Sequence, residues 1–413
     1  MEQATNEYKR KLRYVNYLTA LFLLVSGAKG LSGECVTFFS DKLIHDLHFT
    51  TSQYSSMTSL YYLSFGTASI VIGALVSRSR RRKVWVMPMT LMVGVFSVLA
   101  SRANGYWGLA ACRFGTGIFT GSSHAIMLNI ISKNLVREDY GTRTGIIGGG
   151  STIISGIMGP VILAALATYY AWNSSFLLTG LLLIFMSILI LLTVKEVDCE
   201  IKARRGGFSE YLGSVKELFQ NRAFVLCFII GLLETTGNLC LGVFMPLYFS
   251  EVMGFDTVTK GWFMSLRGMC YIPVGFLVPL LADRFPVKRV MACTFMGAFI
   301  APAAAFLLTR TMTSVYLMAV FGAWAGVTVT LFTYMIPRVT LPENLYIQAS
   351  GMILGVAVLF GGSLAPQIMS ALIESGWEIE YVLGLCAALF AVCAILSLFV
   401  NLERKTTVQA ANS

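Results

Sequence analysis

The chain alternates between long apolar runs and short polar stretches. Twelve apolar runs can be delimited, at residues 14–36, 53–76, 84–100, 106–131, 145–168, 175–194, 223–249, 259–282, 290–308, 314–336, 348–372 and 381–400. Most are close to the roughly 20 residues that cross a hydrocarbon core about 30 Å thick. They lack the strict polar–apolar alternation of membrane β-barrels. The pattern therefore predicts an all-α polytopic membrane protein with 12 transmembrane helices.

A basic cluster in the first half of the chain returns in the second half. Gly73–Val84 (GALVSRSRRRKV) aligns with Pro279–Val290 (PLLADRFPVKRV) at an offset of 206 residues. Each cluster lies between two apolar runs, in a short loop at a membrane face. We therefore expect two pseudo-repeated six-helix bundles, residues 1–194 and 223–413, joined by a cytoplasmic linker at residues 195–222.

Composition and charge agree with a membrane protein. Hydrophobic residues make up 56% of the chain and charged residues 13%, well below the charged fraction of soluble domains. The net charge of +10 does not indicate a nucleic-acid partner, because the basic residues fall in short loops between apolar runs. Lysines and arginines in the loops and tails divide 24 to four between the two sides of the membrane. This bias predicts a multi-pass plasma-membrane protein, in a bacterium the inner membrane, with both termini in the cytoplasm.

Two motifs resemble those of the major facilitator superfamily, and the resemblance covers essentially the whole chain. The loop motif of that family is Gly-x-Leu-x-Asp-Arg-x-Gly-Arg-Lys; the matching residues here are Gly73, Leu75, Arg78, Arg81 and Arg82, whereas Ser77 replaces the Asp. The second motif, in the fourth run, is matched by Leu109, Arg113 and Gly117. The resemblance implies transport by alternating access, with a conformational latch formed by the basic loops, at Arg78 in the first half and at Asp283 with Arg284 in the second.

Three cations, Lys29, Arg113 and Arg267, lie inside apolar runs. A charged residue at mid-bilayer costs at least about 2.5–3.5 kcal/mol on insertion scales, so such residues usually face a water-filled path. At about 1.5 Å of rise per residue, all three lie at a similar depth. We therefore expect them to bind a small organic anion through its carboxylate. The alternatives are that the two arginines extend to the membrane surface and that Lys29 pairs with Glu34.

Lys29 and Arg113 also resemble the basic residues of the anion:cation symporter group within this superfamily. That resemblance implies proton-coupled uptake of small organic acids. The chain departs from the group at Thr120, where an acidic residue is usual, and this departure weakens the transfer of the coupling mechanism.

A proton-coupling residue must change its proton affinity between access states. Glu234, near the middle of the seventh run, is the first candidate, with Glu34 and His124 as weaker ones. The alternative for Glu234 is a structural hydrogen bond to a neighbouring helix. Further candidate substrate ligands are the polar side chains Asn238, Tyr61, Tyr334 and Gln367.

Other functional classes have weaker support in the sequence. The spacings place no nucleophile together with a base, so we expect no enzyme activity, and none of the nine cysteines has metal-ligand spacing, so no cofactor is expected. The expected partners are the anion, a proton and the lipid bilayer, and the protein is expected to act as a monomer. Two alternatives stay open: an exchanger or exporter of organic anions, amino acids, siderophores or drugs, and a non-transporting membrane sensor. Gly156, Gly159 and Pro160 partly resemble a motif associated with exchangers.

Overall fold

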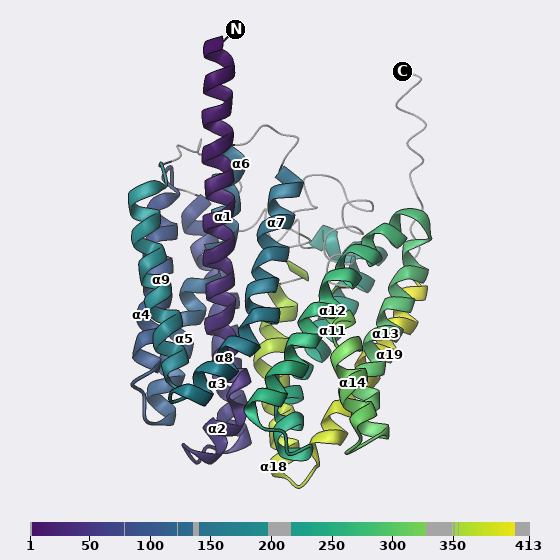
Figure 1. Ribbon diagram of the computed structural model, residues 1–413. Helices are drawn as coiled ribbons and strands as arrows, with labels where there is room; N and C mark the ends of the chain where they lie inside the picture. Colours follow the sequence, from purple (N-terminus) through teal and green to yellow (C-terminus); the bar gives the residue numbers. More distant parts are fainter. Residues whose placement is uncertain are drawn as a thin grey trace, which may run out of the picture. The chain divides into compact units, whose positions relative to one another are not determined.

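The computed structural model describes residues 2–77, 79–121, 123–134, 140–196, 216–327, 349, 352–353 and 355–400. Throughout these ranges the chain is folded mainly into helices joined by turns (Figure 1). The first half contains α1 (Glu2–Phe38), α2 (Ser40–His45), α3 (Thr51–Ser77), α4 (Lys83–Ala100), α5 (Tyr106–Gly121), α6 (Ser123–Asn134), α7 (Tyr140–Thr152), η2 (Ile153–Met158), α8 (Gly159–Tyr169) and α9 (Ser174–Thr193). The second half contains α11 (Arg222–Leu247), η3 (Tyr248–Val252), α12 (Thr257–Arg284), α13 (Val287–Leu307), α14 (Met312–Phe321), α15 (Trp324–Val327), η5 (Phe360–Leu364), α18 (Ala365–Glu374) and α19 (Ile379–Leu398).

Nine helical stretches within the described residues are long and apolar enough to cross a membrane. The fifth apolar run is not a uniform helix. It consists of α7, the π-helical segment η2 and α8, and α8 has Pro160 in its first turn. Because α8 continues directly from η2, Pro160 lies inside a continuous helical stretch, where it cannot donate a backbone hydrogen bond to the preceding turn, and that turn is the π-helical segment.

The starts of the helices follow the repeat found in the sequence. Helix α3 begins at Thr51 and α12 at Thr257, and α5 begins at Tyr106 and α14 at Met312. In both pairs the separation equals the 206 residues that separate His45 from Glu251. The offset of the basic clusters therefore extends to α3 and α12, which end in these clusters, and to α5 and α14.

The chain divides into two compact units. Unit 1 comprises Met1–Ala203, Met245–Met269 and Pro366–Ser375, so it joins the first half of the chain to two segments of the second half. Within it, α4 packs on α9, α3 on α5, and α1 on α7 and η2. A line of buried hydroxyls, Ser32, Ser97 and Thr179, connects α1, α4 and α9 by hydrogen bonds.

Unit 2 comprises Arg204–Phe244, Cys270–Ala365 and Gly376–Ser413. Its described core is formed by α11, α13 and α19, with Phe295 and Phe390 fully buried. Helix α13 packs along α19 and α14. The predicted division of the chain into bundles at residues 194 and 223 stays a prediction.

Candidate substrate-binding site

Arg113 lies two turns into α5 and points into unit 1. Its side chain is only 4% exposed, and its guanidinium carbon lies 4.6 Å from the centroid of the Tyr61 ring on α3. Among the described residues, Arg113 Nε has no hydrogen-bond partner. The cation therefore does not extend to the surface of the protein, and its guanidinium retains a donor for a ligand.

The close packing of α3 on α5 brings Tyr61 to Arg113. Gly117, one turn after Arg113, faces α3, and a Cβ placed there would lie 1.9 Å from Ser64 Oγ and 2.4 Å from the carbonyl oxygen of Tyr61. Only glycine allows this backbone approach. Tyr62 packs edge-on against Tyr61, with ring centroids 5.2 Å apart. The arginine is thus positioned by an aromatic wall on the neighbouring helix.

Lys29 is another buried cation of unit 1. It is 5% exposed, and its Nζ has no hydrogen-bond partner in the described part of the chain. Glu34 does not neutralise it, because Glu34 is exposed and accepts a hydrogen bond from Thr37 Oγ1 at 3.0 Å. Burial of an unpaired ammonium group is costly, so an anionic partner is chemically favoured here.

The α1 face around Lys29 has both a second unpaired donor and free space. Ser26, one turn before Lys29, has a buried hydroxyl without a hydrogen-bond partner among the described residues. Gly33, one turn after Lys29, has no atom within 4 Å of the position that a Cβ would occupy. This face of α1 therefore leaves room for a polar ligand beside the lysine.

Arg267 approaches the same part of unit 1 from α12. The residue after it, Gly268, packs against Gly156 of η2, and Gly30 of α1 packs against Ser155 of η2. Ser265 Oγ also donates to the carbonyl oxygen of Ile157, at 2.8 Å. Lys29 and Arg267 are thus each next to a glycine that contacts the same turn of η2. Arg267 itself is half-buried and has its own polar or electrostatic contact within the protein.

Two predicted site residues are described in unit 2. Glu234 on α11 is fully buried and accepts a hydrogen bond from Thr235 Oγ1 at 3.0 Å. Asn238 follows one turn later, and its Nδ2 lies 3.6 Å from the position of a Cβ on Gly326 of α15. The carboxylate and the amide therefore share a face of α11, as their spacing predicts.

The remaining predicted residues are exposed or lie outside what the structure describes. Gln367 is exposed on α18. Tyr334 and Arg78 lie outside the described residues, as do the side chains of His124 and Asp283, while Arg284 is exposed at the end of α12. The latch predicted at Arg78, Asp283 and Arg284 therefore stays a prediction.

In the described part of the first basic loop, Arg82 forms hydrogen bonds with α3 and α6. Its guanidinium donates to Asn129 Oδ1 of α6 through Nε, at 3.1 Å, and to the carbonyl oxygen of Val76. Glu196 Oε1 accepts hydrogen bonds from the backbone N–H groups of Arg82 and Lys83, at 2.7 and 3.0 Å. A carboxylate at a helix N-terminus is favourable, so Glu196 stabilises the start of α4. The sequence motif indicated this loop but not Glu196.

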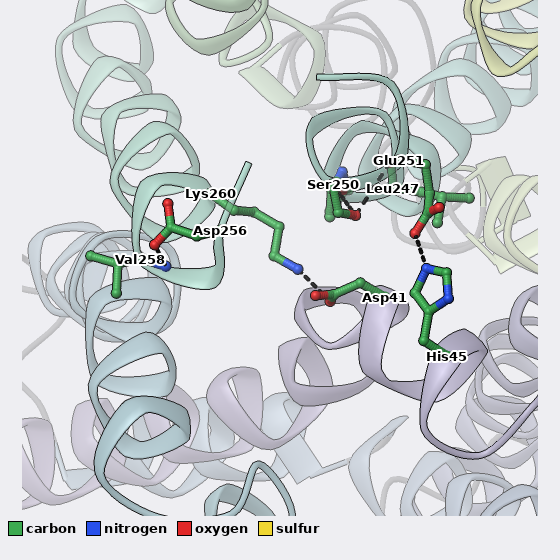
Figure 2. A network of polar contacts seen from close by, with 9 residues as sticks. Asp41, His45, Leu247, Ser250, Glu251, Asp256, Val258 and Lys260 are labelled. Atoms are coloured by element: carbon green, nitrogen blue, oxygen red, sulfur yellow. Dashed lines mark hydrogen bonds and ion pairs between the residues drawn. The ribbon is translucent and has the colours of Figure 1, made fainter. Parts of the chain in front are cut away.

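Four polar residues at the α2 end of unit 1, three of them charged, were missed by the sequence reasoning. Lys260 Nζ donates to Asp41 Oδ1, and His45 Nε2 lies 2.9 Å from Glu251 Oε1 (Figure 2). The turn before α12 carries a further carboxylate, Asp256, and hydrogen bonds from Thr259 and the backbone lower its pKa. A usable signal was present, since His45 and Glu251 are separated by the repeat offset of 206 residues.

Comparison with known proteins identifies the family. The Major Facilitator Superfamily profile matches residues 22–366. The multidrug resistance protein MdtL of Klebsiella pneumoniae (strain 342) is 25% identical over 368 residues, which are 88% of this chain and 90% of that protein. The uncharacterized transporter YycB of Bacillus subtilis (strain 168) is 25% identical over 362 residues, with 84% and 85% coverage.

Solved structures share the fold. The nucleoside transporter NupG (D323A mutant) matches with a TM-score of 0.78 at 15% identity, over 93% of this chain and 99% of that chain. A bacterial homolog of the human lysosomal transporter Spinster, in an inward-facing conformation, matches with a TM-score of 0.72 at 15% identity, over 94% and 95% of the two chains. The prediction of an all-α, 12-helix membrane fold in two pseudo-repeated bundles is confirmed. This chain belongs to the Major Facilitator Superfamily and is a multi-pass membrane transporter.

Proposed function

We propose that the protein is a secondary active transporter of a small organic anion, held by Lys29 and Arg113. The observation that supports this most directly is the pair of buried cations whose Nζ and Nε have no hydrogen-bond partner among the described residues. Arg113 keeps an available donor at Nε beside the Tyr61 ring, and a planar guanidinium is suited to hold both oxygens of a carboxylate. Ser26 supplies a further donor beside Lys29, and Arg267 assists from α12.

Coupling to protons is assigned to Glu234. A carboxylate that is fully buried on α11 can take up or release a proton as its surroundings change between access states. We propose that this coupling drives uptake, in the manner of the anion:cation symporters.

Export or exchange is the second candidate. The likeness to MdtL, whose name describes multidrug resistance, supports it, as does the partial exchanger motif at Gly156, Gly159 and Pro160. An exporter of this kind would use the same two cations for an anionic compound. A non-transporting sensor would bind the anion without moving it.

The experiment begins with a thermal-shift screen of organic acids on the purified protein, because a bound ligand stabilises the folded state by RT ln(1 + [L]/Kd). The flux of the acid that gives the largest thermal shift is then measured in proteoliposomes under an imposed pH gradient. Lys29→Gln and Arg113→Gln should each weaken binding at least roughly tenfold, which corresponds to the loss of one charged contact. Arg102→Gln, which removes an exposed cation from another loop of unit 1, is the matched control. Wild-type affinity in both site variants would refute the assignment. Movement of the acid opposite to the direction of proton flow would indicate export or exchange, and binding without flux would indicate a sensor.

A further inference from the structure

The short helix α2 carries two residues that form polar contacts with the second repeat. Asp41 and His45 are four residues apart, so they project from the same face of α2. Asp41 pairs with Lys260 in the first turn of α12, and His45 pairs with Glu251 in η3 (Figure 2). We call Asp41, His45, Glu251 and Lys260 the α2 clamp. All four belong to unit 1.

The backbone of the second repeat is shaped to present both partners. Segment η3 ends in a reversal closed by the hydrogen bonds Met253 N to Tyr248 O and Phe255 N to Phe249 O. Gly254 has a φ of 67°, in the left-handed region that favours glycine. The reversal turns the chain directly into α12, and Glu251 and Lys260 therefore both face α2.

The two pairs differ in strength because they differ in burial. The side chains of Lys260 and Asp41 are 0% and 15% exposed, and Lys260 Nζ also lies 5.2 Å from the Phe38 ring centroid. Removal of one partner from a buried pair leaves an uncompensated charge, which is strongly unfavourable. The side chains of His45 and Glu251 are 63% and 31% exposed, so their contact is worth much less.

The position of the second pair is defined by the repeat. His45 and Glu251 are separated by the same 206 residues that separate the starts of α3 and α12, so they occupy equivalent positions in the two copies. Equivalent residues of two related copies can touch only close to the axis that relates them. Contacts there must break when the copies move apart at this end.

We propose that the α2 clamp holds this end of the protein closed and is released when this end opens. The buried pair Asp41–Lys260 supplies most of the holding energy, and His45–Glu251 adds a smaller contribution at the axis. Only the role of the α2 clamp in the transport cycle rests on the proposed function. The closed contact itself can be measured without a substrate.

The test uses the full-length protein in lipid nanodiscs, with native cysteines replaced and spin labels attached at Asp46→Cys and Val258→Cys, both exposed positions on either side of the clamp. Double electron–electron resonance measures the distance between the two spin labels and gives the populations of short and long separations. Asp41→Asn and Lys260→Gln should each raise the ratio of long to short separations at least roughly tenfold. The exchanged pair Asp41→Lys with Lys260→Asp should restore most of the short population. Arg102→Gln is the control and should leave the distribution unchanged.

A distribution that is the same in Lys260→Gln and in the control would overturn the proposal, whether or not the protein transports an anion. If the buried variants fail to fold, His45→Gln tests the same idea at an exposed side chain. It should raise the long population roughly two- to threefold, in keeping with an exposed pair. No shift in that variant would also overturn the proposal. If the clamp opens as expected but no organic acid binds, the proposed substrate fails while the clamp stands.

Discussion

Arg113 shows how a single side chain can be held in place without being neutralised. The ring of Tyr61 stabilises the buried guanidinium by a cation–π contact worth about 0.5–2 kcal/mol, which is less than an acidic partner would give. The electrostatic neighbours of Arg113 are Tyr61, Tyr62, Cys35 and Glu34, of which only Glu34 is a carboxylic acid. The arginine is therefore oriented by aromatic groups and retains capacity for an anion.

Arg113→Lys tests this orientation at constant charge. An ammonium group cannot stack on Tyr61 as a planar guanidinium does, nor can it hold both carboxylate oxygens in a fixed fork. We expect the affinity for the transported acid to fall roughly five- to tenfold, with little change in melting temperature. Isothermal titration of the purified variant measures the affinity. An unchanged dissociation constant would show that only the charge matters.

Gly33→Leu tests the free space on α1. Since no atom lies within 4 Å of a Cβ at Gly33, the new side chain meets no protein group there, and leucine is a better helix former than glycine. We expect the melting temperature to stay the same or rise, whereas ligand binding falls at least roughly tenfold because the side chain fills the space beside Lys29. Retained binding would place the ligand elsewhere.

Helix packing sets the positions of these side chains, and α3 on α5 is the decisive contact. Gly117→Ala would place a methyl group 2.4 Å from the carbonyl oxygen of Tyr61, so the two helices must separate. We expect a loss of about 1–3 kcal/mol of stability, as in other overpacked cores, together with weaker ligand binding because Tyr61 moves away from Arg113. Thermal unfolding and ligand titration measure the two effects. Gly33→Ala is the matched control and should show no loss of stability.

The turn before α12 gives a prediction for pH. Hydrogen bonds from the Thr259 side chain and from the backbone N–H of Val258, which donates to Asp256 Oδ2, lower the pKa of Asp256 in the folded state. Its contribution to stability is therefore complete above the unfolded-state pKa of about 3.9 and is lost as the pH falls through the lower folded-state pKa. We expect Asp256→Ala to lower the melting temperature at pH 7 and to have a smaller effect near pH 3. Asp46→Ala, at the end of α2, is the control carboxylate. An Asp256→Ala effect that grows on acidification would contradict this account.

For the whole molecule, the decisive question is how ion and substrate movements are linked. Glu234→Gln keeps the size of the fully buried side chain but removes its ability to release a proton. We expect substrate accumulation driven by a pH gradient to be abolished, while exchange of substrate across the membrane continues. Proteoliposome flux under both conditions measures the difference. Full gradient-driven accumulation in the variant would exclude Glu234 as the coupling residue.

The architecture was predictable from the sequence because it depends on features that extend over long stretches of the chain. Apolar runs near the length of a bilayer crossing, the imbalance of loop charges and the two related basic clusters all indicate the same 12-helix fold. The π-helical form of η2 was not predictable, because the apolar pattern does not distinguish a π-helical turn from an α-helical one, and the close approach of Gly30 and Gly268 to that segment joins residues far apart in the sequence.

The candidate site was predictable only in part. Lys29, Arg113 and Arg267 stood out because charges are rare in apolar runs, but the stacking of Arg113 on Tyr61 depends on how α3 meets α5. Asp41 and Lys260 did not stand out, since both were expected in loops or helix ends where charge is ordinary. Their burial follows from contacts between distant segments, which no local pattern records.

The contact between His45 and Glu251 also shows a consequence of having both copies in one chain. If the two halves were identical polypeptides assembled as a pair, this position would set histidine against histidine or glutamate against glutamate, and the latter would repel. Because one chain carries both copies, these two equivalent positions hold different side chains. They can therefore make a hydrogen bond that an assembly of identical halves could not possess.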